Sequence, residues 1–431
     1  MAIEEKTMQV DLAYGKTGLR ATLPQRQVVK ILTMKPADPI LDPPTAVIKS
    51  LLNPIGFSHS LYDMAKNHNS ACILICDITR PVPNKIILPP VLKSLAAAGI
   101  PHHATHILIA TGIHRPNLND ELIELVGPEI AARYRIENHF SRDLASHTCL
   151  GKTSRGTDIW IDSRFVEAEY KIAAGFIEPH LMAGFSGGRK LVVPGVSSIE
   201  TMKYMHGPKI MEHPLSREGV IEGNPFHQEA LEIATRAGVD FIVNVALNEK
   251  REIIGVFSGH LEAAHQKGVE FVRSIVRDTV PQPVDIVLTT SAGYPLDTTY
   301  YQSIKGLTAA MPIVKQGGTI ILAACCESGL GSDEFAGLAT DPRPVAEIIE
   351  EIVSERQFVI DQWQFEKFAQ AARKAEIILV ADGLKPEIKN RLHVKWANSV
   401  EQAVAMAVKT HGHSSRIAVI PKGPYILAEV E

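Results

Sequence analysis

The feature that most constrains this chain is a series of short, almost wholly apolar runs that each end in a polar loop rich in Gly, Thr, Asp or Pro. Strands of a parallel sheet covered on both faces have this pattern, whereas half-exposed strands alternate apolar and polar residues. The runs occupy residues 71–81, 106–116, 170–180, 284–297, 318–332, 375–384 and 416–424. Helical patterns between them occupy residues 89–100, 344–356 and 366–377. The sequence therefore predicts an α/β fold with mainly parallel sheets flanked by helices.

The length of the chain favours two domains, because 431 residues exceed the size of a single hydrophobic core. Two prolines in "RDTVPQPVDIV" precede a new strand and favour a boundary near residue 280. We therefore expect an N-terminal α/β domain of residues 1–279 and a C-terminal α/β domain of residues 280–431. A strand pair is expected within residues 1–24 and an antiparallel hairpin within residues 240–259.

Charge and composition exclude several classes of protein. The formal net charge of −4 offers no basic footprint for nucleic acid or acidic lipid. No apolar run reaches membrane-spanning length, and the first residues do not have the pattern of a signal peptide. The five cysteines are odd in number and lack metal-finger spacing, which argues against a disulfide framework. A cytoplasmic protein is the expectation.

Polar residues that directly follow the predicted strands are the candidates for chemistry, since ligands of open α/β sheets lie outside the carboxyl ends of strands. In "DITRP", Arg80 presents a fork of donors that suits a carboxylate or phosphate, although Asp77 and Arg80 could equally staple the turn. In "ATGIHRP", His114 can pass protons in both directions near neutral pH, but a lone histidine is often structural.

The stretch "HLMAGFSGGRK", residues 180–190, is not a standard P-loop, because Arg189 and Leu191 occupy the positions of the required glycine and hydroxyl residue. Its glycines permit close approach of the backbone to a ligand, and Lys190 can act as a charge or as a nucleophilic amine. His180 begins the stretch, and His206 follows it. A plain glycine-rich turn is the alternative interpretation.

A fourth loop, "SAGYPLDTTYYQSIKG", supplies Tyr301, Gln302 and Lys305. Gln302 and Lys305 are three residues apart, so a helix would place them on one face, where they suit a small carboxylate. The alternative is a solvated first helical turn. The sequence has neither a G-x-G-x-x-G fingerprint after a strand nor a dedicated zinc pattern. The residues alone predict a small-anion site with two candidate acid/base histidines and a lysine.

Four motifs together resemble those of the nickel-dependent lactate racemase family: "DITRPVP", "ATGIHRP", "PHLMAGFSGGRKLVVPG" with a later "MHG", and "GYPLDTTYYQSIKG". Members of that family racemise or epimerise 2-hydroxy acids. The resemblance extends over nearly the whole chain. It implies an isomerase with its active site in the cleft between two domains.

The resemblance also implies a nickel-pincer nucleotide cofactor, pyridinium-3,5-bisthiocarboxylic acid mononucleotide, whose synthesis depends on separate maturation proteins. The cofactor itself supplies three nickel ligands, so the protein need supply only His206. Lys190 matches the lysine to which a cofactor arm is tethered. The loop beside the mononucleotide comprises Asp77, Ile78, Thr79 and Arg80.

By the same resemblance His114 and His180 are the acid/base pair, each serving one enantiomer while hydride passes between C2 and the cofactor. Residues implied to hold the substrate carboxylate and offset charge on its oxygen are Arg80, Gln302 and Lys305. Tyr301 and Trp363 resemble aromatic residues that wall the pocket, although a plain core position also suits Trp363.

In the pattern that the resemblance implies for lactate-specific members, a third glycine precedes the lysine that matches Lys190. This chain has Arg189 at that position. Such a cation could reach a cofactor phosphate, pair with an acid, or favour a second carboxylate in the substrate. Malate, a longer aliphatic or aryl 2-hydroxy acid and a sugar acid are therefore alternative substrates. A nickel-cofactor binding protein without turnover and a nicotinamide-dependent dehydrogenase are rivals in function. The sequence leaves the oligomeric state open.

Overall fold

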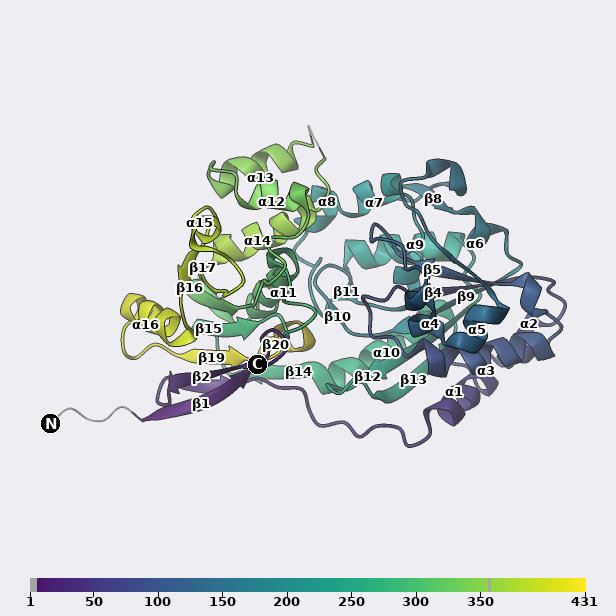
Figure 1. The fold of residues 1–431 in the computed structure, drawn as a ribbon, viewed down its shortest axis with the longest axis horizontal. Helices are drawn as coiled ribbons and strands as arrows, with labels where there is room; N and C mark the ends of the chain where they lie inside the picture. Colours follow the sequence, from purple (N-terminus) through teal and green to yellow (C-terminus); the bar gives the residue numbers. More distant parts are fainter. Residues whose placement is uncertain (1–5, 356–357) are drawn as a thin grey trace.

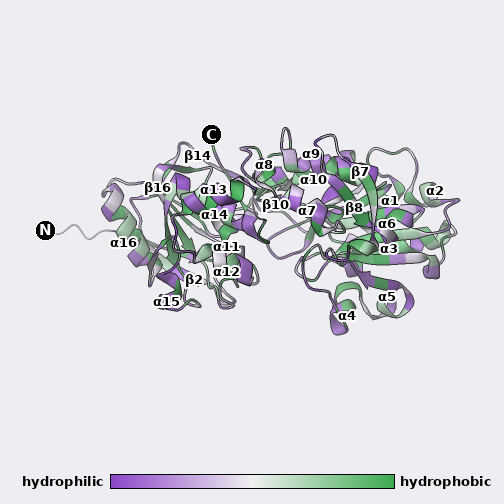
Figure 2. Cartoon of the chain, turned by 90° about the horizontal axis from the view of Figure 1, so that it is seen from above, coloured by the Kyte–Doolittle hydropathy of each residue, from purple (hydrophilic) through white to green (hydrophobic). Residues whose placement is uncertain are grey.

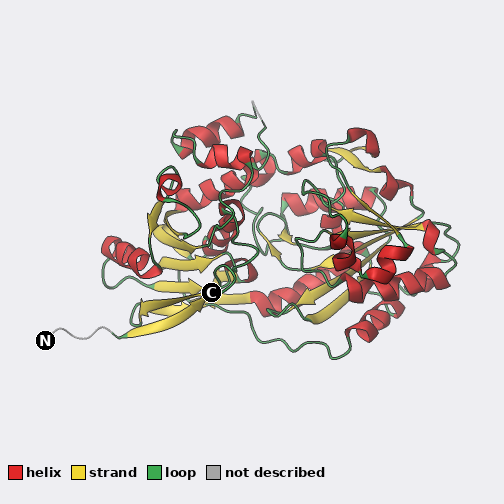
Figure 3. Ribbon diagram, viewed as in Figure 1, coloured by secondary structure: helices red, strands yellow, loops and turns green. Residues whose placement is uncertain are grey.

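The computed structural model describes residues 6–355 and 358–431, and these form two lobes, each built on a six-stranded sheet. Figures 1 and 3 show the lobes side by side, with helices on the faces of each sheet. Many helices in Figure 2 carry both hydrophobic and hydrophilic colour, as helices with one face on a sheet do. The α/β prediction with mainly parallel sheets is confirmed.

The first sheet has the strand order β13-β12-β9-β4-β5-β6. Its strands are β4 (Ala71–Cys76), β5 (Thr105–Ala110), β6 (Arg135–Asn138), β9 (Tyr170–Phe176), β12 (Phe241–Leu247) and β13 (Ile253–Gly259). All neighbours are parallel except β12 and β13, which form the predicted hairpin. Ile73 of β4 lies between Ile107 and Ile172 in one core cluster, and its neighbour Leu74 lies with Leu108 and Ala173 in another, so apolar side chains cover both faces of the sheet.

The second sheet is wholly parallel, in the order β18-β17-β16-β15-β19-β3. Its strands are β3 (Val28–Ile31), β15 (Val284–Thr290), β16 (Val314–Ala323), β17 (Ala375–Val380), β18 (Lys395–Ala397) and β19 (Ile417–Ile420). The boundary near residue 280 coincides with the passage between the lobes, where α10 (Leu261–Val276) is followed by β14 (Arg277–Val280). β14 pairs with β20 (Leu427–Val430) at the end of the chain.

Residues 7–31 pack with the second lobe, whereas we expected them in an N-terminal domain of residues 1–279. β1 (Thr7–Leu12) and β2 (Leu19–Pro24) form the expected strand pair, and residues 1–5 lie outside the described part. The pair packs against the second sheet, and β3 closes the edge of that sheet beside β19 (Figure 1). We propose a second domain that combines residues 6–31 with residues 277–431. The partner strand lies nearly 400 residues away in sequence, so local patterns could not reveal this pairing.

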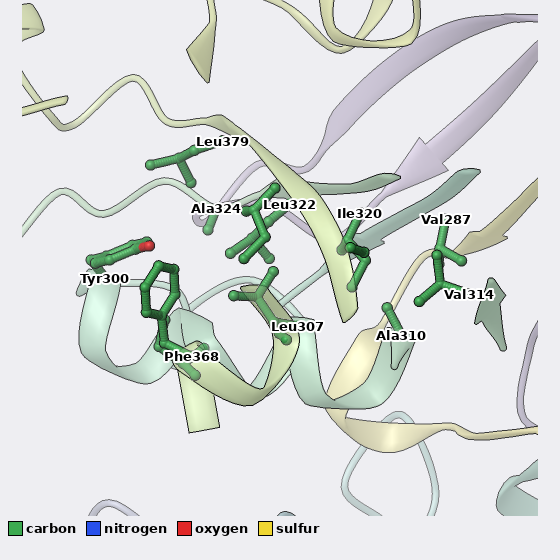
Figure 4. Close-up of a cluster of buried hydrophobic side chains, with 14 of the residues drawn as sticks. Val287, Tyr300, Leu307, Ala310, Val314, Ile320, Leu322, Ala324, Phe368 and Leu379 are labelled. Carbon is green, nitrogen blue, oxygen red and sulfur yellow. The ribbon is translucent and has the colours of Figure 1, made fainter. Parts of the chain in front are cut away.

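Two helices of the second lobe, α11 (Tyr300–Ala310) and α14 (Gln362–Lys374), pack against β16 and carry residues toward the first lobe. Figure 4 shows Leu307 of α11 and Phe368 of α14 in the same buried cluster as Leu322. Interiors of this kind are close-packed, and truncating one such leucine to alanine costs about 2–5 kcal/mol. The polar faces of both helices are thereby held in place at the interface between the lobes.

In the described part of the chain, no helix combines the length and the apolar character that crossing a lipid bilayer requires.

Candidate functional site

A cavity of about 170 Å³ lies between the lobes, where the carboxyl ends of β4, β5 and β9 face α11 and α14. These three strands are neighbours in the first sheet, so the loops that follow them converge. The predicted site residues that line the cavity are Asp77, Arg80, His114, His180, Lys190, His206, Tyr301, Gln302, Lys305 and Trp363. Ile78 and Thr79 instead line an adjoining cavity of about 100 Å³.

His114 is oriented by Asp77, whose Oδ2 lies 2.7 Å from the ring Nδ1. Asp77 Oδ1 also accepts hydrogen bonds from the backbone N–H and the hydroxyl of Thr79. Burial alone would raise the pKa of Asp77, but the hydrogen bond and charge of His114, together with Arg80, outweigh it and hold that pKa at about 2. Asp77 is therefore ionised, and the Nδ1–H of His114 donates to it. In the neutral form of the ring, the lone pair of His114 Nε2 is a proton acceptor.

His180 differs from His114 in the nitrogen that carries the ring proton. Its Nδ1 accepts hydrogen bonds from the backbone N–H groups of Met182 and Ala183, both at 3.2 Å. The ring proton therefore lies on Nε2, which is 3.0 Å from Lys190 Nζ. Burial and the nearby charge of Arg80 keep the pKa of His180 well below its ordinary value. The cavity thus receives a proton acceptor from one imidazole and an N–H from the other.

Lys190 accepts the hydrogen bond from His180, which requires a neutral amine. Burial, followed by the charges of Arg80 and Arg189, shifts the pKa of Lys190 well below its ordinary value in agreement with this arrangement. A neutral lysine amine in a desolvated pocket is a nucleophile that can form a covalent bond.

His206 ends α7 (Ile199–Met205), and its Nδ1 lies 3.1 Å from the carbonyl oxygen of Met202. Nδ1–H donates to that carbonyl, which leaves the Nε2 lone pair for a metal ion, in the arrangement usual for ligating histidines. The rings of Trp363 and Phe226 pack against the imidazole at 4.7 and 5.4 Å between centroids. Burial lowers the pKa of His206 to about 3, so the ring is neutral.

Within residues 6–355 and 358–431, no cluster of three or more His, Cys, Asp or Glu side chains could hold a metal ion by itself. A metal bound at His206 would therefore need most of its ligands from another molecule.

Glycines of the 180–190 stretch allow a backbone conformation and a close contact that larger residues would not permit. Gly187 has φ +83°, and a Cβ there would lie 2.6 Å from Asn244 Oδ1 of β12. The same oxygen accepts a hydrogen bond from the backbone N–H of Gly188 at 2.8 Å. Larger residues are excluded because the chain turns in the left-handed region while it lies against the first sheet. This turn delivers Lys190 to the cavity.

Arg189 does not line the cavity, so its expected roles toward a phosphate, an acid or a second substrate carboxylate are not supported. The short helix η3 (Gly188–Leu191) turns Lys190 to the cavity and Arg189 into the core, where it is 1 % exposed. Its guanidinium donates to the carbonyl oxygens of Ala183 and Phe185 at 2.9 and 3.0 Å and lies 2.7 Å from His265 Nε2. Arg189 therefore braces the loop that carries His180 and Lys190.

Replacing Arg189 with methionine is expected to lower the free energy of unfolding by about 2–4 kcal/mol, because two buried carbonyl groups lose their donors. Chemical denaturation measures the effect, with Arg133→Met at an exposed position as the control. A change below about 0.5 kcal/mol, the usual range for surface substitutions, would show that the brace contributes nothing to stability.

The second lobe contributes the remaining side of the cavity. The hydroxyl of Thr299 caps α11 by accepting from the N–H of Gln302 at 3.3 Å. Trp363 Nε1–H donates to the Tyr301 hydroxyl at 3.1 Å and so joins α14 to α11. Trp363 is 4 % exposed, packs in a core cluster of the first lobe and also lines the cavity. Burial, with Arg80 nearby, lowers the pKa of Lys305 to about 7.

The cavity residues that were missed from the sequence include Glu178 and Gln364. Glu178 stands two residues after β9 in the run that also contains His180, so the rule that selected Asp77 after β4 would have found it. Gln364 donates from Nε2 to the carbonyl oxygen of Tyr301 at 2.8 Å. Its position in a helix adjacent to Trp363 offered no separate signal.

Comparisons with known proteins match this chain to lactate racemases over nearly its whole length. Residues 14–219 match the model of the lactate racemase N-terminal domain, and residues 279–427 match that of the lactate racemase C-terminal domain. The chain is 35% identical over 419 residues to a lactate racemase of Lactiplantibacillus plantarum, covering 96% of this chain and 98% of the relative. It is 33% identical over 422 residues to a lactate racemase of Thermoanaerobacterium thermosaccharolyticum, covering 97% and 98%.

Two solved structures are similar to this fold. The lactate racemase apoprotein from Thermoanaerobacterium thermosaccharolyticum superposes with a TM-score of 0.92 at 33% identity, covering 98% of this chain and 100% of that one. A protein from Thermotoga maritima superposes with a TM-score of 0.68 at 16% identity, covering 90% and 99%, which shows the fold alone.

Proposed function

The chain belongs to the lactate racemase family, and from this premise we propose that it is an isomerase that interconverts the two enantiomers of lactate or of a similar 2-hydroxy acid. One observation carries the proposal beyond the family assignment. His114 and His180 line the same cavity, and their hydrogen bonds present a ring lone pair from one and a ring N–H from the other.

Racemisation of a 2-hydroxy acid requires two groups of this kind. The hydroxyl proton must leave from one pose of the substrate, and a proton must return to the oxygen after the other face of the planar 2-keto acid has reacted. A single base on one side serves only one enantiomer. In our proposal His114 Nε2 accepts the hydroxyl proton of one enantiomer, and His180 Nε2–H returns a proton to the oxygen in the pose of the other. Solvent then carries the proton from His114 to His180 and restores both rings.

Arg80 of the first lobe would hold the substrate carboxylate together with Gln302 and Lys305 of the second lobe. Gln302 has a buried side-chain oxygen without a hydrogen-bond partner in the described chain, which leaves it free for a substrate hydroxyl. Tyr301 and Trp363 would wall the pocket and exclude water from the reacting centre.

The residues present fit a nickel-pincer nucleotide cofactor, pyridinium-3,5-bisthiocarboxylic acid mononucleotide. His206 offers one free lone pair, and the described residues contain no cluster that could add further metal ligands; Lys190 offers a neutral amine suited to a covalent tether. Asp77, Thr79 and Arg80 would lie beside the mononucleotide, together with Ile78. When bound, this cofactor would supply the acceptor for hydride from C2, which no side chain of the site provides.

The proposal is tested by producing the protein together with the cofactor maturation proteins and measuring its nickel content. The nickel-loaded protein is then incubated with single enantiomers of lactate, malate, an aryl 2-hydroxy acid and a sugar acid, each followed by chiral chromatography. We expect lactate or one of its close analogues to reach equal amounts of both enantiomers. Full nickel content without racemisation would favour a binding protein, and net oxidation with formation of NADH would favour a dehydrogenase.

A further inference from the structure

The substrate cavity and its neighbour meet at a group of charged residues. The cavities of about 170 and 100 Å³ share Arg80, Glu178, His180, Leu181 and Lys305 in their linings. Two cations and one anion therefore stand at the junction. The carboxylate of Asp77 is hydrogen-bonded to His114, and the neutral amine of Lys190 is hydrogen-bonded to His180.

Glu178 is held in position by its backbone. Its N–H donates to the hydroxyl of Ser186 at 2.9 Å, and its carbonyl oxygen accepts from the N–H of Ser186 at 2.9 Å. These bonds lie beside the short strand pair β10 (Pro179–His180) and β11 (Gly184–Phe185). These two bonds fix the backbone at Glu178, so its side chain stays at the lining of both cavities.

Glu178, Arg80 and Lys305 form no direct ion pair or side-chain hydrogen bond within the described chain, although they share one small space. Unpaired charges in a confined site are costly, and a ligand that completes the set relieves that cost. Two cations and one carboxylate leave one positive charge uncompensated. Burial raises the pKa of Glu178, and the charges of Arg80 and Lys305 oppose that rise; the ionised carboxylate is the form that repels a second substrate carboxylate.

We infer that Glu178 selects 2-hydroxy acids with one carboxylate, as in lactate, and excludes those with two, as in malate. This inference rests on the proposed function. One substrate carboxylate neutralises the excess positive charge of Arg80 and Lys305. A second carboxylate in a cavity of about 170 Å³ cannot lie far from Glu178, and like charges at low effective dielectric repel strongly.

The inference is tested on the nickel-loaded protein with Glu178→Gln, which removes the charge and keeps the shape. Two quantities are measured: the ratio of kcat/KM for malate to that for lactate, and the inhibition constant of malate against lactate racemisation. We expect the ratio to rise and the inhibition constant to fall, each by about tenfold or more. Glu124→Gln at an exposed position removes the same charge outside the cavities and should change neither.

Glu178→Asp is the second variant, and it should keep the preference for lactate because the charge remains. This comparison separates charge from packing, since a purely structural role would alter both variants alike. An active wild type with less than about a twofold change in both quantities for Glu178→Gln would overturn the inference and leave the proposed function intact. A nickel-loaded wild type that racemises neither acid would overturn both.

Discussion

Replacing His206 with alanine is expected to reduce nickel retention at least about 100-fold, because His206 is the only side chain proposed to bind the metal and even outer-shell changes cost 10–100-fold. The imidazole is already oriented for this role by its hydrogen bond to Met202. Nickel content is measured by elemental analysis after gel filtration of protein produced with the maturation proteins.

His213→Ala is the matched control, because His213 is exposed and lies outside the cavity. Its nickel content should equal that of the wild type. Unchanged nickel in the His206→Ala variant would show that the ligand is misassigned. A covalent tether at Lys190 could hold the cofactor without its metal, so the mass of the denatured protein should be measured alongside the nickel content.

Removing either proposed acid/base histidine is expected to lower racemisation about a thousandfold, within the range found for positioned proton-transfer groups, while nickel content stays unchanged. His114→Ala removes the acceptor held by Asp77, and His180→Ala removes the N–H held beside Lys190. Because the equilibrium constant of racemisation is one, kcat/KM must fall equally for both enantiomers in each variant. Chiral chromatography from each pure enantiomer measures this.

His103→Ala provides the control, since this histidine is exposed in η1 (His102–Ala104) and lies outside the cavity. Retention of more than about a tenth of the wild-type rate by His114→Ala or His180→Ala would contradict the paired-histidine mechanism. Loss of nickel together with activity would instead indicate that the histidine supports the cofactor.

Much of the fold could be predicted from local patterns. All seven apolar runs became strands, and "DFIVNVALNEKREIIGVFSG" became an antiparallel hairpin. Continuous apolar runs are required wherever helices cover both faces of a sheet, so each run carries its own signal. β3 had no such signal, because its place depends on an edge of β19 that exists only after folding.

Some features of the site could be predicted from the sequence, and others could not. His114 and Asp77 follow adjacent strands, and sheet order alone brings them together, at 2.7 Å. Glu178 was overlooked beside the more reactive His180. Arg189 and Lys190 are neighbours in sequence, yet one enters the core and the other the cavity, because the turn of η3 separates their directions.

The sequence by itself determined the strands, the helices between them and the chemical groups at the strand ends, since these depend on residues close together in the chain. Only the tertiary structure decided which charges remain unpaired, which imidazole nitrogen carries a proton and which lobe holds the first strands. Those outcomes depend on burial and on partners far away in sequence. His180 illustrates the difference: its identity is local, but its role follows from two backbone N–H groups and a lysine that folding places around the ring.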